Sequence, residues 1–394
     1  MNRNPGHRKV SSLTTRAAVI VVLIFANGCL EPYAPALVTV DYNFLVIEGF
    51  LVGNDSSFVK ISRSQPIGDA TPYESEIHAT VEVEAENGTK YSLSEKSNGV
   101  YVAPPLNLTS SVNYRLHIRT DDTKEYYSEY VPLKESPPLD SVVWAETPSG
   151  DGVQFNVFAH DPENKTRYYL WKADETWKYV STATSIYYYK NGEMLQRDSS
   201  TELYNCWKTL PVNNIFLHSS TTLAEDIISD FELFAIPQNS RKLYFGYSLQ
   251  VKQYALTREA FDYWSMIKKN SESLGSLFDP VPAQPFSNIR CTTNPEEPVI
   301  GMFSATTVQE KRVHFTRQDI TGPSSEYTPT GYEYCTGEII LLEHISAFTL
   351  QNKLVEKKYF DLVTFEHLGY VVGREDCMDC RKKGGVTQKP IYWR

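Results

Sequence analysis

Two cysteines near the C-terminus, Cys377 and Cys380, have the C-x-x-C spacing that several kinds of chemistry use. The pair could form half of a zinc site, a redox centre or the ends of disulfide bridges. A zinc knuckle needs a second closely spaced pair, but Cys206, Cys291 and Cys335 are far from one another in the sequence. A thioredoxin-like redox centre lies at a strand-to-helix turn early in a βαβ unit, not near an irregular end. The choice depends on the compartment in which the chain folds.

The N-terminus predicts export from the cytoplasm. Four basic residues precede an apolar run, Ala17–Ala26, and Cys29 follows the small residue Gly28; the basic residues are Arg3, Arg8, Lys9 and Arg16. About ten apolar residues are too few to cross a bilayer, which needs roughly 20 in a helix. The pattern predicts a lipoprotein signal peptide over residues 1–28, with Cys29 acylated, for example by palmitate, as the first mature residue. The alternative is an ordinary signal peptide followed by a chance cysteine.

Export favours disulfide bridges over zinc or redox chemistry, because the periplasm is oxidising. By elimination we expect one bridge between Cys206 and Cys291, and another from Cys335 to either Cys377 or Cys380, with one thiol left over. Cys377 and Cys380 could instead bridge each other in a small loop. A bridge across about 40 residues stabilises the fold by about 3–4 kcal/mol in the loop-closure model. Such a bridge would hold the tail down, with Trp393 as an apolar contact on the body.

No other residue pattern indicates catalysis or cofactor binding. The sequence has no G-x-S-x-G, H-E-x-x-H or P-loop motif, and none of its eight histidines pairs with another two to four residues away. We therefore expect no catalytic residue, no metal site and no cofactor. The formal net charge of −10, without a long basic run, argues against a nucleic-acid partner.

The composition, with 26 Tyr, 18 Phe and only 5 Met, is that of a β protein. After a tether over residues 29–40, the segment 41–136 has short strands about every ten residues, which predicts an immunoglobulin-like sandwich. Its strands include Phe44–Val52, and Asn87-Gly88 predicts a type I′ hairpin turn. Ser136-Pro137-Pro138 interrupts the pattern, so we place a domain boundary there.

Residues 139–394 predict a larger β-sandwich-type domain. Its strand candidates are 153–159, 167–173, 231–236, 243–254 and 313–316. A helical insertion is predicted near residues 257–275, starting at the N-cap Thr257. Phe261, Trp264 and Ile267 form an aromatic and apolar stripe at helical spacing. We expect this stripe to pack on a sheet, and a ligand-binding stripe is the alternative.

An aromatic-rich segment, 171–189, is the predicted partner-binding region. Its aromatic residues are Trp171, Trp177, Tyr179, Tyr187, Tyr188 and Tyr189. Three adjacent tyrosines in a strand must place at least one ring on each face. Tyr and Trp dominate interface hot spots, and the competing interpretation is core packing.

Nearly the whole mature chain resembles the Bacteroidota lipoproteins grouped as domain of unknown function 4249. The segments that carry the resemblance are 29–33 (CLEPY), 45–49 (LVIEG), 248–254 (SLQVKQY), 288–291 (NIRC), 299–303 (VIGMF), 379–381 (DCR), 384–385 (GG) and 390–393 (PIYW). Met302 and Tyr392 depart from the family pattern, in which Tyr and Phe are commoner.

The resemblance implies a lipid-anchored outer-membrane protein, often encoded beside a TonB-dependent receptor, without an established activity. Leu30-Glu31-Pro32 after the lipidated cysteine suggests exposure at the cell surface. Our leading hypothesis is a non-enzymatic accessory binding subunit of a TonB-dependent transporter. A structural or adhesive surface lipoprotein is the second hypothesis, and a hydrolase whose site is assembled from distant carboxylates is the third.

Overall fold

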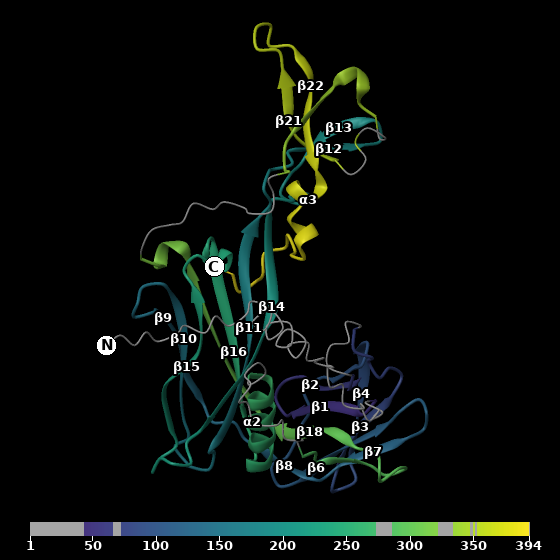
Figure 1. Ribbon diagram of the computed structural model, residues 1–394, viewed down its shortest axis with the longest axis vertical. Helices are drawn as coiled ribbons and strands as arrows, with labels where there is room; N and C mark the ends of the chain where they lie inside the picture. Colours follow the sequence, from purple (N-terminus) through teal and green to yellow (C-terminus); the bar gives the residue numbers. More distant parts are fainter. Residues whose placement is uncertain are drawn as a thin grey trace, which may run out of the picture. The chain divides into compact units, whose positions relative to one another are not determined.

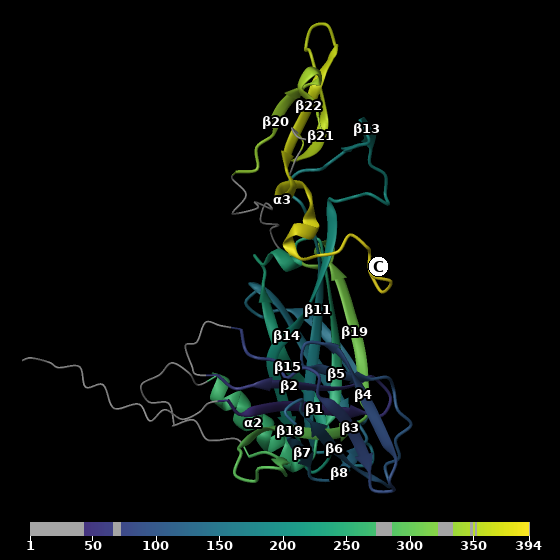
Figure 2. The same ribbon diagram turned by 90° about the vertical axis from the view of Figure 1, so that its right-hand side faces the viewer.

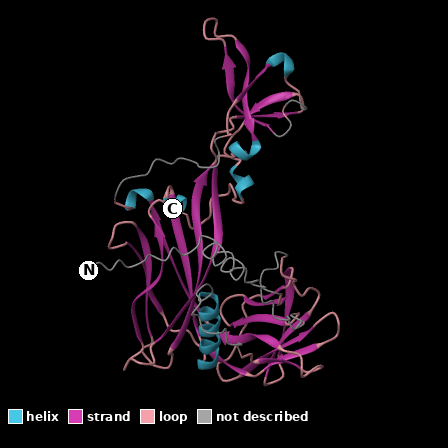
Figure 3. Cartoon of the chain, viewed as in Figure 1, coloured by secondary structure: helices cyan, strands magenta, loops and turns pink. Residues whose placement is uncertain are grey.

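The computed structural model describes residues 43–65, 72–272, 286–321, 334–346, 350 and 353–393. The predicted signal peptide, Cys29 and the tether lie outside these residues. The described part is mainly β, as the sequence predicted (Figures 1 and 3). Its helices are all too short or too polar to cross a membrane.

Seven strands of the N-terminal region and one later strand, β18, form a sheet that closes on itself. They are β1 (Leu45–Val52), β2 (Ser57–Arg63), β3 (Thr80–Ala85), β4 (Lys90–Ser97), β5 (Val100–Ala103), β6 (Asn113–Arg119), β8 (Val131–Lys134) and β18 (Val299–Thr306). Their order is β6-β3-β4-β5-β2-β1-β18-β8, and β8 also pairs with β6. We call this closed sheet the ring. β7 (Glu125–Ser128) and β17 (Ile289–Cys291) extend it beyond β6.

The closed pairing is not the immunoglobulin-like sandwich that the sequence predicted. β18 runs parallel to β1, from Leu45 opposite Val299 to Val52 opposite Thr306. Alternation of apolar residues predicts which side chains of a strand are buried, but not which strand lies beside it. The boundary at 136–139 stays a prediction, although β17 and β18 come from beyond it and join the ring.

The β3–β4 hairpin forms at the predicted place with a different turn. A type I′ turn needs a positive φ at both central residues. Here Gly88 has a φ of 87°, whereas Asn87 is not among the residues with positive φ. The Gly88 amide donates to the Ala85 carbonyl at 2.8 Å, so the turn spans 85–88 and only the glycine is left-handed.

Two further sheets form a sandwich around a second core. The three-stranded sheet has the order β15-β10-β9, and the four-stranded sheet has the order β14-β11-β16-β19 (Figures 1 and 2). The strands are β9 (Leu139–Glu146), β10 (Gly152–His160), β11 (Tyr168–Val180), β14 (Asn205–Ser219), β15 (Ile227–Pro237), β16 (Gly246–Ala255) and β19 (Val308–Thr316). Phe155 of β10 packs against Tyr247 and Phe315 of the facing sheet, with ring centroids 5.4 and 6.1 Å away.

The predicted helical insertion is α2 (Arg258–Glu272). The Thr257 hydroxyl accepts the Ala260 amide at 3.2 Å and so caps the first turn. Trp264 is buried in a cluster that also contains Phe50 of the ring and Tyr254 of the sandwich. The aromatic stripe therefore packs in a core, as predicted.

A five-stranded sheet contains the last strands. It has the order β13-β12-β21-β22-β20, with β12 (Tyr187–Lys190), β13 (Glu193–Gln196), β20 (Glu338–Leu341), β21 (Lys353–Phe360) and β22 (His367–Arg374). The short helices are η1 (Arg241–Leu243), η2 (Arg317–Asp319), η3 (Leu342–His344), α3 (Glu375–Met378) and η4 (Cys380–Lys383).

Two disulfides hold α3 and η4, and one of the cysteines that the structure describes remains free. The bridge between Cys335 and Cys377 is one of the two predicted alternatives and is confirmed. The predicted bridge between Cys206 and Cys291 is wrong, because Cys206 pairs with Cys380. Cys291 is a free, buried residue of β17 in the ring core, whereas Cys206 lies on β14 of the sandwich.

Candidate binding surfaces

Two residues of the predicted partner-binding region are buried. Trp171 is fully buried on β11 and donates its indole N–H to Gln253 Oε1 at 3.1 Å. Tyr179 is also buried, and its hydroxyl donates to the Cys380 carbonyl at 2.7 Å. Both side chains therefore stabilise the fold rather than contribute to a surface.

The other residues of that region are half-buried. Lys242 lies over the Trp177 ring at 5.1 Å. Tyr187 and Tyr189 pack against the core of the five-stranded sheet, while Arg197 lies over the Tyr188 ring at 5.1 Å. Part of each ring remains accessible, so a contribution of these four residues to partner binding stays a prediction.

Three strongly exposed apolar side chains gather where β21 turns into β22. Leu362, Val363 and Phe365, which we call the hairpin tip, are 90%, 85% and 78% exposed. Asp361 Oδ1 accepts the amides of Val363 at 2.8 Å and Thr364 at 2.7 Å. Backbone N–H groups, first that of Thr364, hold the pKa of Asp361 below its usual value. These hydrogen bonds order the turn. Figure 1 shows it at the end of the β21–β22 hairpin.

Sequence reasoning missed the hairpin tip. Residues 359–372 (YFDLVTFEHLGYVV) are apolar almost throughout, and the turn itself has no Gly, Pro or Asn to mark it. Phe365 adopts a φ of 57°, which a bulky residue rarely does. A run of apolar residues between two strands predicts burial, so only the structure places these three side chains in solvent.

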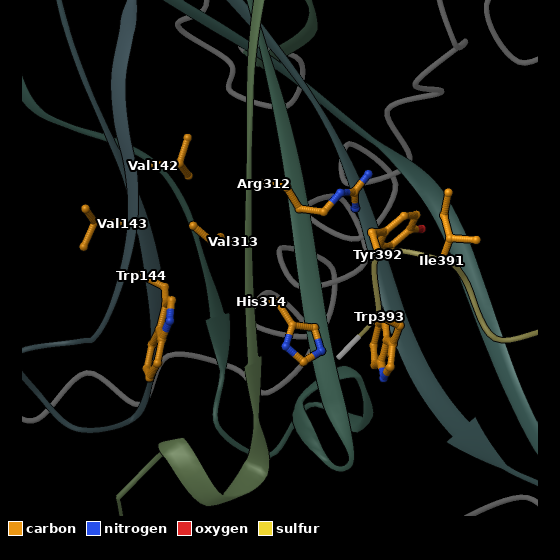
Figure 4. A pocket seen from close by; sticks show the side chains of 9 residues that line it. All are labelled: Val142, Val143, Trp144, Arg312, Val313, His314, Ile391, Tyr392 and Trp393. Carbon is orange, nitrogen blue, oxygen red and sulfur yellow. The ribbon is translucent and has the colours of Figure 1, made fainter.

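A pocket of about 710 Å³ lies where the sandwich meets the end of the chain. It is lined by Val142, Val143, Trp144, Arg312, Val313, His314, Ile391, Tyr392 and Trp393. Figure 4 shows three groups of side chains, from β9, from β19 and from the C-terminal segment. No carboxylate of the described residues lines it, so the facing acids that a hydrolase would need are not found there.

The C-terminal segment forms one wall of this pocket. Trp393, predicted as an apolar contact, is 9% exposed and lies edge-on to His314 and Trp207, with centroids 4.8 and 6.3 Å away. A Cβ at Gly246 would lie 3.1 Å from the Trp393 ring, so the glycine makes room for it. The adjacent Tyr392 hydroxyl is 3.0 Å from Thr176 Oγ1.

Three side chains of residue types that can bind a metal ion lie close together outside the pocket. Candidate ligand atoms of Glu82, Glu84 and His117 lie within 4.8 Å of one another. The sequence did not predict this group because His117 comes from β6, opposite Glu82 of β3. Lys90 and Arg115 each bind Glu84 at 2.7 Å, so the cations of the chain already compensate this carboxylate.

These features define a mainly β protein with an exposed apolar hairpin tip and a pocket beside its C-terminal segment. The chain belongs to the family described as domain of unknown function (DUF4249), whose model matches residues 31–312. The match leaves out the hairpin tip and both C-terminal disulfide partners. No curated protein matches the chain.

Proposed function

We propose that the protein is a non-enzymatic outer-membrane lipoprotein of the Bacteroidota kind, exposed at the cell surface, that serves as an accessory binding subunit of a TonB-dependent receptor. The signal-like N-terminus with Cys29 and the resemblance stated above support the location. A structural or adhesive role without transport is the second candidate.

The hairpin tip is the observation that supports partner binding. Burying an exposed Leu, Val or Phe side chain stabilises a complex by about 1.5–3 kcal/mol each. The ordered turn around Asp361 lowers the entropy that binding must overcome. Asp361 and Glu366 flank the tip, and their charges disfavour insertion into an anionic membrane. A pocket on a protein therefore fits the tip better than a lipid surface.

Co-purification from native outer membranes tests this function. The double variant Leu362→Ser/Phe365→Ser should recover at least about tenfold less of the TonB-dependent receptor encoded beside the protein than the unaltered chain. Leu223→Ser removes another exposed leucine, 47% exposed, and should leave recovery unchanged. Receptor recovery that does not depend on the tip, or no receptor in any sample, would contradict the proposal.

The location has its own test. Cys29→Ala should release the protein from the membrane into the soluble fraction and abolish labelling by a fatty acid. Retention of both the membrane association and the label would favour the ordinary signal peptide.

A further inference from the structure

The pocket of Figure 4 opens between two edge strands. β19 is the last strand of the four-stranded sheet, and β9 is the last strand of the three-stranded sheet. The two edges are close, because the rings of Trp144 on β9 and Phe315 on β19 are 4.5 Å apart. An edge strand presents main-chain groups that can pair with another extended chain.

The hydrogen bonds at the two ends of β19 show which of its main-chain N–H groups point away from the sheet. The Val308 amide donates to Asn54 Oδ1 at 2.8 Å, and the Thr316 amide donates to Asp319 Oδ2 at 2.7 Å. Neither bond goes to β16, the neighbour of β19 in the sheet. Main-chain N–H groups alternate sides along a strand, so the amides of Glu310 and Arg312 also point away from β16.

Arg312 lies on β19 and has a positive charge that no described carboxylate neutralises in an ion pair. Its guanidinium donates to Ser248 Oγ at 3.2 Å and to Gln250 Oε1, and it stacks on Tyr392 at 3.7 Å. These partners are all neutral, and among the described residues no carboxylate forms an ion pair with Arg312. A guanidinium held flat in this way is suited to bind a carboxylate through two N–H groups.

The remaining lining is apolar and fits side chains of an extended peptide. Val143 is exposed and Trp144 and Val313 are half-buried, so the edge of the sandwich core faces the pocket. Successive side chains of an added strand alternate between faces. One face would contact this apolar edge, and the other would face Arg312 and the C-terminal aromatic wall.

We propose that this cleft binds an extended acidic peptide segment of a partner protein. The segment pairs through its main chain with the outer edge of β19, and one of its carboxylates binds Arg312. The cation supplies the charge complementarity, and the open edge supplies the main-chain partners. The site does not involve the hairpin tip and stands independently of the proposed function.

Synthetic peptides test the proposal by fluorescence anisotropy with the full mature chain. The probe is a capped, labelled peptide about eight residues long in which Val and Thr alternate around a central Glu. One control peptide has Gln in place of Glu, and another carries N-methyl groups on alternate amides, which removes main-chain donors without changing side chains. Hydrogen exchange of β19 amides is followed in parallel, because strand pairing should slow it.

The Glu peptide should bind about tenfold more tightly than the Gln peptide, since hydrogen bonds to a charged group are the stronger ones. Arg312→Gln should abolish this preference, and Arg312→Lys should keep part of it. Arg290→Gln, an exposed arginine elsewhere, should keep all of it. The N-methylated peptide should not bind, and Leu362→Ser/Phe365→Ser should bind the Glu peptide normally. Equal binding of Glu and Gln peptides, binding that tolerates N-methylation, or no binding of any peptide would overturn the proposal.

Discussion

The ring and the sandwich use their strand edges differently. Each of the eight strands of the ring has a neighbour on both sides, because β8 pairs with β18 and β6. The sandwich has four edge strands, β9, β14, β15 and β19, each with a neighbour on one side only among the described strands. The ring closes through short contacts, since β8 pairs with two residues of β18 and two of β6. An edge strand of the sandwich has one whole side without a neighbouring strand, so we place the proposed backbone pairing there.

An ion pair surrounded by aromatic rings connects the ring to the sandwich. Lys172 of β11 forms an ion pair with Glu48 of β1. Its ammonium group also lies 4.6 Å from the Phe50 ring, 4.8 Å from Phe58 and 5.6 Å from Trp264. Substitutions in the ring, in the sandwich or at this contact therefore test whether the two regions unfold together.

Loss of the bridge between Cys206 and Cys380 should have the largest effect, confined to the sandwich. The bridge spans 174 residues of sequence. The loop-closure model assigns such a bridge about 5 kcal/mol of stability. Cys206→Ser/Cys380→Ser should lower the unfolding free energy by an amount of that order and speed exchange of β14 amides, but not of β1 amides. Cys291→Ser, which breaks no bridge, is the control. Equal acceleration in both regions would show that they unfold as one.

Gly301→Val should damage the ring and spare the sandwich. A Cβ at Gly301 would lie 2.3 Å from the Ile47 carbonyl, across the parallel pair of β1 and β18. Backbone must move to relieve the clash, which costs about 2–3 kcal/mol. Gly53→Ala, whose Cβ meets nothing closer than 3.6 Å, should be almost neutral. Denaturant unfolding of both variants measures the difference, and a neutral Gly301→Val would show that the strands can separate here.

Lys172→Met should weaken the contact between the ring and the sandwich by about 1–2 kcal/mol of interaction free energy, because the ion pair and the contacts with the aromatic rings are lost. We expect the thermal unfolding of the ring and of the sandwich to separate by calorimetry. Lys311→Met, which alters an exposed lysine of β19, should leave a single transition. If both variants behave alike, the apolar cluster alone couples the two regions.

Acid should weaken the ring slightly through Glu297. Burial alone would raise the pKa of Glu297, but hydrogen bonds from Lys124 at 2.8 Å and Tyr126 at 2.6 Å outweigh it and hold the pKa below the usual value. The unfolded chain therefore binds this proton at higher pH than the folded chain does. The stabilisation is complete above the unfolded pKa and is lost as pH falls through the folded one. Unfolding free energies from about pH 6 to about pH 3 should show a shallower slope for Glu297→Gln.

The sequence predicted single strands better than their partners. Strands near Phe44–Val52 and Val153–Ala159 follow from local alternation, and α2 follows from its cap and stripe. The neighbour of β1 could not be predicted, because β18 is far along the chain and any apolar strand satisfies β1 locally. The prediction for Cys206 failed for the same reason: elimination compares distances in sequence, whereas Cys206 meets Cys380 through folding. The bridge from Cys335 to Cys377 was predicted correctly, as one of two alternatives, because the two cysteines are only 42 residues apart.

The candidate site was predicted less well than the fold. Aromatic density identified Trp171–Tyr189, but an aromatic side chain serves a core as readily as a surface, and Trp171 is fully buried. The pocket depends on Arg312 and Tyr392, which come from separate segments and have no pattern of their own. Of the pocket lining, the sequence placed only the segment 390–393 against the body of the protein, with Trp393 as its apolar contact.

The parallel pairing of β1 with β18 sets an order for biosynthesis. The ribosome synthesises the N-terminus first, so β1 emerges long before its partner at Val299–Thr306. Throughout the delivery of the intervening strands, Leu45–Val52 presents an apolar segment with one open side. Such a segment pairs readily with other chains, and contacts between distant residues form slowly. One side of β1 therefore stays without its native neighbour until Thr306 has been synthesised.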